Sequence, residues 1–180
     1  IVASTSFFVP KPFTPFQWAK QATKEEFLNK SYITRLAVME QLNQKSIKYN
    51  WHEADTSVLE GVLARGDRRL SKALELAQKR GFAFDAWDER FDYDKWIEVI
   101  KDAGLDPAFY ANRAYGLDEI LPWDVIDCGV TKSFLIRERA KAYEGKRTPS
   151  CREKCSGCGA NSLGGERTCC PKKEKAEENE

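Results

Sequence analysis

The sequence predicts an α/β fold that becomes mostly α-helical along the chain and ends in a cysteine-rich tail. Two β-rich segments, residues 1–9 and 46–51, flank a segment with helical spacing, an order typical of a parallel βαβ unit. Helical patterns then follow one another through residue 143, and residues 146–170 hold five of the six cysteines. We therefore divide the chain into residues 1–54, 55–145, 146–170 and a charged tail, 171–180, which we expect to be disordered.

Composition excludes some classes of partner. The 29 basic and 28 acidic residues nearly cancel, and a nucleic-acid binder more often shows a net basic face, so we expect no DNA partner. The chain lacks a run of about 18 apolar residues, so we expect no membrane partner. Residues 1–9 are too short and too polar for a signal peptide, which favours a cytoplasmic protein. Because the chain begins inside a strand-like run at Ile1, we interpret it as part of a longer protein.

The first predicted strand is followed by a proline-rich loop. Residues 1–9 are rich in β-branched and aromatic side chains and predict a strand, which Pro10, Pro12 and Pro15 then end. The loop has two interpretations. It either packs against the protein as a hydrophobic lid, or it faces a ligand at the carboxyl end of a strand, where active sites of α/β barrels collect.

The remaining elements are predicted from caps and spacing. Thr23 and Glu26 form a capping-box pattern that opens a helix reaching about residue 45, and residues 46–51 predict a second strand. Ser57 and Glu60 repeat the capping-box pattern before a helix over residues 58–64. Further helices are predicted over residues 70–79, 93–103, 107–111 and 131–143, the first two ended by glycines at positions 81 and 104.

Three arginines stand within five residues in the sequence RGDRR at positions 65–69. Guanidinium groups bind carboxylate or phosphate in a bidentate manner, so the cluster is a candidate anion clamp. The alternative is an ordinary helix junction, in which Asp67 caps the next helix and the arginines pair with Glu60 and Glu75.

The cysteines predict a metal site. Cys151, Cys155 and Cys158 are spaced C-x3-C-x2-C, and thiolates this close in sequence can converge on zinc or on an iron–sulfur cluster. Cys169 or Cys170 is available to complete the shell. Disulfides suit short secreted chains and are the weaker interpretation. A third interpretation is that these residues hold no stable metal.

Several stretches read together resemble one family. They are FVPKPFTPFQW at residues 8–18, LE at 59–60 with RGDRR at 65–69, WDVIDCGVTKSFL at 123–135 and TPSCREKCSGCG at 148–159. In this order they resemble the C-terminal part of radical S-adenosylmethionine proteins that carry an N-terminal B12-binding domain and have no assigned substrate. Phe13 stands where the family pattern leads us to expect a histidine.

The resemblance implies a fold and a chemistry. Residues 1–54 would be the last strands and helix of a partial TIM-like barrel, followed by a helical extension and the cysteine-rich segment. The cluster that binds S-adenosylmethionine and the B12 module would lie upstream, in a part of the enzyme that is the main expected partner. The C-x3-C-x2-C spacing matches that of the cofactor-binding cluster, but its place after a helix near the chain end favours an auxiliary iron–sulfur or zinc site.

The implied reaction is radical cleavage of S-adenosylmethionine or cobalamin-linked methyl transfer, on a small-molecule or RNA substrate that the sequence does not name. The isolated chain is expected to be inactive. The candidate residues facing substrate or cofactor are Lys11, Gln17, Glu60, Arg65, Asp67 and Arg68, and the candidate metal ligands are Cys151, Cys155, Cys158 and Cys170.

Two other functions fit the same residues. One is a non-catalytic, zinc-binding helical module that grips a protein or RNA through the arginine cluster and the cysteine tail. The other is a purely structural helical domain. Stoichiometric zinc favours the first, whereas unchanged melting after Cys151→Ser and Cys155→Ser substitution favours the second.

Overall fold

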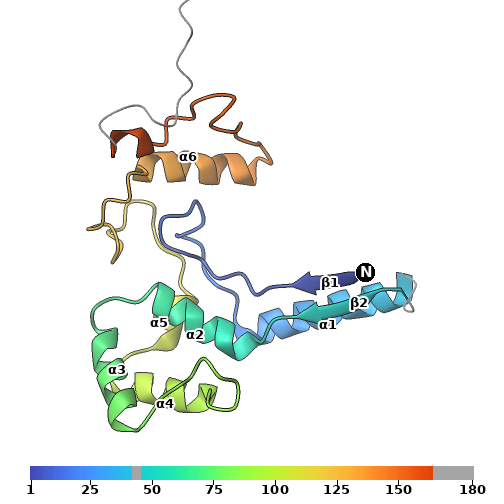
Figure 1. Ribbon diagram of the computed structural model, residues 1–180, viewed down its shortest axis with the longest axis vertical. Helices are drawn as coiled ribbons and strands as arrows, with labels where there is room; N and C mark the ends of the chain where they lie inside the picture. Colours follow the sequence, from blue (N-terminus) through green and yellow to red (C-terminus); the bar gives the residue numbers. More distant parts are fainter. Residues whose placement is uncertain (42–45, 164–180) are drawn as a thin grey trace, which may run out of the picture. The chain divides into compact units, whose positions relative to one another are not determined.

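The structure is a computed structural model that describes residues 1–41 and 46–163. These residues form a mostly helical α/β fold with six α-helices and a two-stranded parallel sheet, which is open and not a closed barrel (Figure 1). The chain divides into two compact units. Unit 1 comprises residues 1–12 and 18–122, and unit 2 comprises residues 13–17 together with the chain from Trp123 onward.

Unit 1 begins with the predicted βαβ arrangement. Strand β1 (Val2–Thr5), helix α1 (Lys24–Gln41) and strand β2 (Lys48–Trp51) follow one another, and the two strands pair in parallel with Val2 opposite Lys48 and Thr5 opposite Trp51. Strand β1 is shorter than the predicted residues 1–9, because its partner β2 ends at Trp51, shortly before the next helix begins. The parallel pairing is therefore confirmed, and the predicted length is wrong.

Helix α1 begins as its sequence predicts. The Thr23 N–H donates to Glu26 Oε2 at 2.9 Å, and the Glu26 N–H donates to Thr23 Oγ1 at 3.1 Å, which is a complete capping box. The last described residue of α1 is Gln41. The predicted extension through residues 42–45 lies outside the described residues.

Helix α2 (Ala54–Ala64) begins four residues earlier than predicted. Its N-cap is Glu53, whose side chain accepts a hydrogen bond from the Ala54 N–H, while the Ser57 hydroxyl donates to the Glu53 carbonyl. The predicted Ser57–Glu60 capping box is therefore wrong. Both residues lie inside the helix, where the Ser57 hydroxyl is used by the preceding turn.

The other helices of unit 1 agree closely with their sequence patterns. They are α3 (Leu70–Lys79), α4 (Tyr93–Asp102) and α5 (Pro107–Ala111). Gly81 and Gly104 follow α3 and α4 with φ of +81° and +78°, the left-handed conformation that ends a helix. Helices α2, α3, α4 and α5 pack around a common apolar core whose buried members are Leu59, Val62, Leu70, Ala73, Ala77, Trp96, Val99, Ile100, Tyr110 and Ala111.

A smaller cluster joins α1 to α2 within unit 1. The rings of Phe7 and Phe27 stack at 4.3 Å between centroids, and Ala54 and Val58 pack against them. This contact fixes the amino-terminal half of α1, since Phe27 lies in its first turn.

Unit 2 is built around helix α6 (Lys132–Tyr143), which begins at the predicted cap, because the Thr131 side chain accepts from the Phe134 N–H. The loop Phe13–Gln17 belongs to this unit, and Phe16 packs edge-on against Tyr143 at 5.9 Å. The described chain ends with a short 3-10 turn at Ala160–Ser162. The predicted disordered tail, 171–180, lies outside the described residues, and none of the described helices combines the length and apolarity needed to cross a membrane.

Candidate functional site

The structure distributes the predicted site residues over both units. Lys11, Glu60, Arg65, Asp67 and Arg68 lie in unit 1, whereas Gln17 and the cysteines 151, 155 and 158 lie in unit 2. The predicted fourth metal ligand, Cys170, lies outside the described residues. The candidate residues are therefore considered one unit at a time.

Within unit 1 the fold brings Lys11 and Glu60 together. The Lys11 ammonium forms an ion pair with Glu60 Oε1, across 49 positions of sequence, and the side chains remain 45% and 49% exposed. Lys11 is placed by the buried Pro10, and Glu60 projects from the solvent side of α2. An exposed pair of this kind adds little stability, and both charges stay accessible to a partner.

Arg65 takes a different position from either sequence interpretation. Its side chain is fully buried, and its guanidinium donates to the carbonyl oxygens of Ala111 and Arg113, each at 2.7 Å. The same group stacks on the Tyr115 ring at 4.2 Å. Burial lowers the pKa of the Arg65 guanidinium from its ordinary value, although arginine remains charged in proteins. In unit 1 Arg65 thus serves to close the end of α5 against α2.

The other residues of the RGDRR sequence lie at the surface. The Asp67 carboxylate accepts from the Arg69 N–H at 2.9 Å and from the Arg69 guanidinium at 2.6 Å. These hydrogen bonds hold the pKa of Asp67 below its ordinary value. Arg68 is exposed. Because one arginine is buried and the other two are exposed, the described side chains do not form a three-arginine clamp, and Asp67 caps the turn before α3.

Sequence reasoning missed a second arginine beside Arg65. Arg113 forms two hydrogen bonds with Glu119, at 3.1 and 2.9 Å, and stacks on the Tyr115 ring at 4.3 Å. Hydrogen bonding to Arg113 lowers the pKa of Glu119. No local signal marks this cluster, because its members come from the C-cap of α2 and from the loop after α5, nearly 50 positions apart.

A cavity of about 480 Å³ lies in unit 1 at the carboxyl end of β1. Ligands of α/β proteins bind beyond the carboxyl ends of parallel strands, so the position is one where a ligand is expected. Thr5 and Tyr49 belong to its lining, and their hydroxyl groups are hydrogen-bonded to each other at 2.8 Å. The cavity is lined by Thr5, Ser6, Phe7, Phe8, Lys20, Ala22, Glu26, Phe27, Lys30, Ser31, Thr34 and Tyr49.

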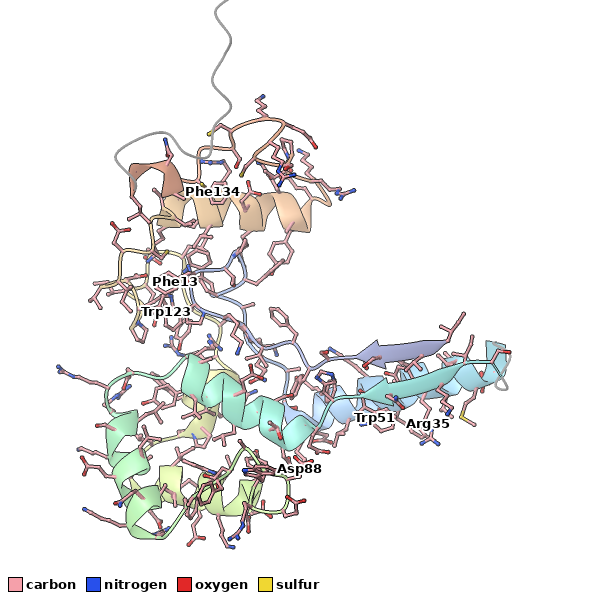
Figure 2. All side chains as sticks on the ribbon, viewed as in Figure 1. Phe13, Arg35, Trp51, Asp88, Trp123 and Phe134 are labelled. Carbon is pink, nitrogen blue, oxygen red and sulfur yellow. The ribbon has the colours of Figure 1, made fainter. Side chains whose placement is uncertain are left out.

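Unit 2 contains a second cavity, of about 500 Å³, around the predicted site residue Gln17. Gln17 is 2% exposed, and its Oε1 accepts from the Phe13 N–H at 3.0 Å and from Trp123 Nε1 at 2.6 Å. Phe13 and Trp123 lie close to each other in Figure 2. The cavity is lined by Phe13, Gln17, Asp124, Val125, Ile126, Asp127, Cys128, Val130, Thr131, Lys132 and Leu135.

The cysteine-rich segment is attached to α6 in unit 2. The Thr131 N–H donates to the Cys158 carbonyl at 2.9 Å, and the Arg137 guanidinium donates to the Ser156 carbonyl at 3.0 Å. Gly157 and Gly159 have φ of +68° and +99°, so the loop between and after the thiols needs glycine. Cys151 and Cys155 are exposed and Cys158 is half-buried.

These thiols do not form a complete metal shell by themselves. Among residues 1–41 and 46–163, no group of three or more histidine, cysteine, aspartate or glutamate side chains is placed to hold a metal ion. The glycines shape a tight C-x2-C loop from Cys155 to Cys158, which is the ligand spacing that zinc commonly uses. Further ligands would have to come from elsewhere, and the metal site remains a prediction.

Comparison with known proteins adds no relative: no family model, no curated protein and no solved structure matches this chain.

Proposed function

We propose that this chain is the closing segment of a radical S-adenosylmethionine enzyme and supplies the last βαβ unit of its barrel. The four sequence stretches that resemble this family support the proposal. The structural observation that carries it is the β1–α1–β2 unit, which has the parallel pairing of a barrel repeat but far fewer covering partners than such a unit needs.

The sheet of this unit is incomplete by physical criteria. Parallel sheets are normally covered on both faces, and two strands alone are rarely stable in water. In the described chain the sheet consists of β1 and β2 only, and Val2 is 64% exposed. Each strand therefore presents an outer edge of backbone donors and acceptors to a further parallel strand.

Helix α1 supports the same proposal. Tyr32, Ile33 and Met39 are 58%, 56% and 42% exposed, and Leu28 and Leu36 are also exposed. A helix with apolar side chains on several faces is normally buried. We therefore assign these residues to an interface with the preceding strand and helix of the same barrel.

In this arrangement the residues of the chain would form part of a substrate cavity. The cavity at the carboxyl end of β1 lies where barrel enzymes place their active sites. Lys11 and Glu60 offer an accessible charge pair in the same unit. S-adenosylmethionine would supply the radical chemistry, bound by a cluster outside this chain, with cobalamin as an optional second cofactor.

The experiment uses the protein made from the whole reading frame that encodes this chain. Purified without oxygen, it should contain iron and acid-labile sulfide and should release 5′-deoxyadenosine from S-adenosylmethionine under reducing conditions. The present 180 residues alone should release none. A reading frame without an upstream cysteine triplet, or a whole protein that never cleaves S-adenosylmethionine, would contradict the proposal.

A matched pair of variants tests the barrel interface itself. Ile33→Asp should leave the melting temperature of the 180-residue chain nearly unchanged, because the side chain is exposed there. In the whole protein it should cause misfolding, because a charge would be buried. Arg35→Asp, on the same helix (Figure 2), is the charge-change control and should be tolerated better in both proteins.

The second candidate, a zinc-binding interaction module, is favoured by one observation. The segment around Cys155 and Cys158 is anchored to α6 by Arg137 and by the Cys158 carbonyl. The loop that carries the two thiols is therefore held in place before any metal binds. One equivalent of zinc in the purified chain, together with no S-adenosylmethionine cleavage by the whole protein, would select this function over the first.

A further inference from the structure

A further cavity of unit 1, of about 560 Å³, is lined by α2, by the loop before α4 and by α4 itself. Leu59 and Trp96 belong both to this lining and to the helical core, so the cavity borders that core. Leu63 also lines it and is 43% exposed, which leaves apolar surface in contact with water. The lining consists of Thr56, Leu59, Glu60, Leu63, Ala64, Asp85, Phe91 and Trp96.

The turn that contributes Asp85 to this lining also exposes two large aromatic side chains. Phe84 and Trp87 are both largely exposed, and the Trp87 N–H donates to the Phe84 carbonyl at 3.0 Å, which closes the turn. Exposed apolar and aromatic side chains next to an apolar cavity are typical of interaction sites. We call this region the Leu63 surface and define it as the cavity lining together with Phe84, Trp87, Asp88 and Glu89.

The ionisable side chains of the cavity lining are acidic. They are Glu60 and Asp85, and the described lining contains no lysine, arginine or histidine. Glu60 is paired with Lys11, whereas no ion pair is found for Asp85 among residues 1–41 and 46–163. The Asp85 carboxylate is therefore available to a positively charged ligand.

The turn adds further negative charge to the Leu63 surface. Asp88 and Glu89 are exposed, and neither forms an ion pair within the described part of the chain (Figure 2 labels Asp88). Arg90 is the cation of the same segment. Three available carboxylates against one arginine favour a basic partner, because complementary charges guide and orient association.

The extent of the Leu63 surface favours a peptide over a small molecule, because Phe84, Trp87 and two of the carboxylates lie outside the cavity lining. An apolar peptide side chain fits the cavity, and flanking basic side chains can pair with the carboxylates. An ammonium or guanidinium group can also stack on Trp87, since indole is the best aromatic partner for a cation.

We propose that the Leu63 surface binds a basic peptide segment of a partner protein, with an apolar side chain in the cavity and lysine or arginine side chains on Asp85, Asp88 and Trp87. This inference rests on unit 1 alone and does not depend on the radical-enzyme proposal. It uses side chains that the proposed barrel interface leaves out.

The probe is the peptide acetyl-RKLLKR-amide with a fluorescent label, titrated with the full 180-residue chain and followed by anisotropy. Binding should be saturable and should weaken when NaCl is raised from about 0.05 to about 0.5 M, because salt screens exposed charges. Serine in place of both leucines should weaken binding by at least about tenfold, the effect of losing one buried apolar side chain. The charge-reversed peptide acetyl-EELLEE-amide should not bind.

A matched pair of leucine variants tests the position of the surface. Leu63→Lys brings a positive charge to the cavity and should abolish peptide binding. Leu74→Lys, on α3, is the control at a leucine of similar exposure, 48%, and should leave the affinity unchanged. Circular dichroism of both variants checks that they fold like the original chain.

A second pair keeps the test valid even if Leu63→Lys misfolds. Asp85→Asn should weaken binding by roughly twofold to fivefold, the range of one exposed ion pair. Asp118→Asn, at an exposed aspartate outside the Leu63 surface, should have no effect.

Three results would overturn the proposal. The first is equal affinity for the leucine and serine peptides. The second is binding of 2-phenylethylammonium as tight as that of the peptide, which would make the cavity a small-molecule site. The third is self-association of the chain that Leu63→Lys abolishes, which would assign the Leu63 surface to a second copy of this protein.

Discussion

In unit 1, helices α2–α5 enclose Val62, Val99 and Ile100, whose side chains are at most 1% exposed, whereas α1 leaves Tyr32 and Ile33 more than half exposed. Both regions belong to the same compact unit. The helical region has a core of ten buried side chains, whereas Phe27 is the buried apolar side chain of α1 in the described chain. The first region thus has a core of its own, and the exposed apolar side chains of the second are the basis of the proposed barrel interface.

Substitutions at two isoleucines test this contrast most strongly. Ile100→Ala should lower the free energy of unfolding by about 2–5 kcal/mol, because it leaves a cavity in a packed core. Ile33→Ala should change it by less than about 0.5 kcal/mol in the same chain, since the side chain is already in water. Urea titration followed by circular dichroism measures both, and equal losses would show that α1 is buried in solution.

Substitution of Arg65 should have the next largest effect on the free energy of unfolding. Arg65→Met should destabilise the chain by about 2–4 kcal/mol, because the carbonyl oxygens of Ala111 and Arg113 would remain buried without their charged donor. Arg68→Met is the matched control at an exposed position and should have almost no effect. If both substitutions left thermal unfolding unchanged, the structural role of Arg65 would be refuted and its role as an anion ligand revived.

A smaller effect is expected at Gly61 in α2. A Cβ at this position would lie 1.9 Å from Gln21 Oε1, so Gly61→Ala should destabilise by about 1–3 kcal/mol through overpacking, partly offset by better helix propensity. Shortening Gln21 to alanine in the Gly61→Ala background should recover part of the loss, because the clash disappears. Additive losses in this double-mutant cycle would show that the two residues do not touch.

The smallest effect concerns pH. Hydrogen bonds from Arg69 hold the pKa of Asp67 below that of an unfolded aspartate, so this carboxylate stabilises the folded state above about pH 4. Its contribution, below about 1 kcal/mol for a surface pair, should disappear as the pH falls through the folded pKa. Urea unfolding of the original chain and of Asp67→Asn should therefore differ at pH 6 and converge near pH 2. A constant difference over this range would contradict the shift.

Local signals predicted much of the fold. The Thr23–Glu26 capping box, the glycines after α3 and α4 and the Asp106-Pro107 start of α5 act within one helical turn, so they can be read without a three-dimensional structure. The error at Ser57 has the same origin. A capping-box pattern also occurs inside helices, and only the Glu53 cap reveals where α2 begins.

The candidate sites were less accessible to sequence reasoning. Gln17 was identified as a site residue, but the bond to Trp123 joins residues 106 positions apart. In the arginine cluster, residues close in sequence have different surroundings. Arg65 is buried, whereas Arg68, three positions later, is exposed. Arg113 and Tyr115, which complete the surroundings of Arg65, carry no local signature.

Where most helices start and stop, and that the first two strands run parallel, could be read from the residues alone, because caps, glycines and the length of a crossover act locally. Which polar side chains are buried became known only from the folded arrangement. Burial depends on packing between distant segments, as for the Arg65 guanidinium beneath the loop after α5 and for Gln17 beside Trp123. The same packing leaves one face of β1–α1–β2 in water, and that exposure is the physical reason to expect a partner there.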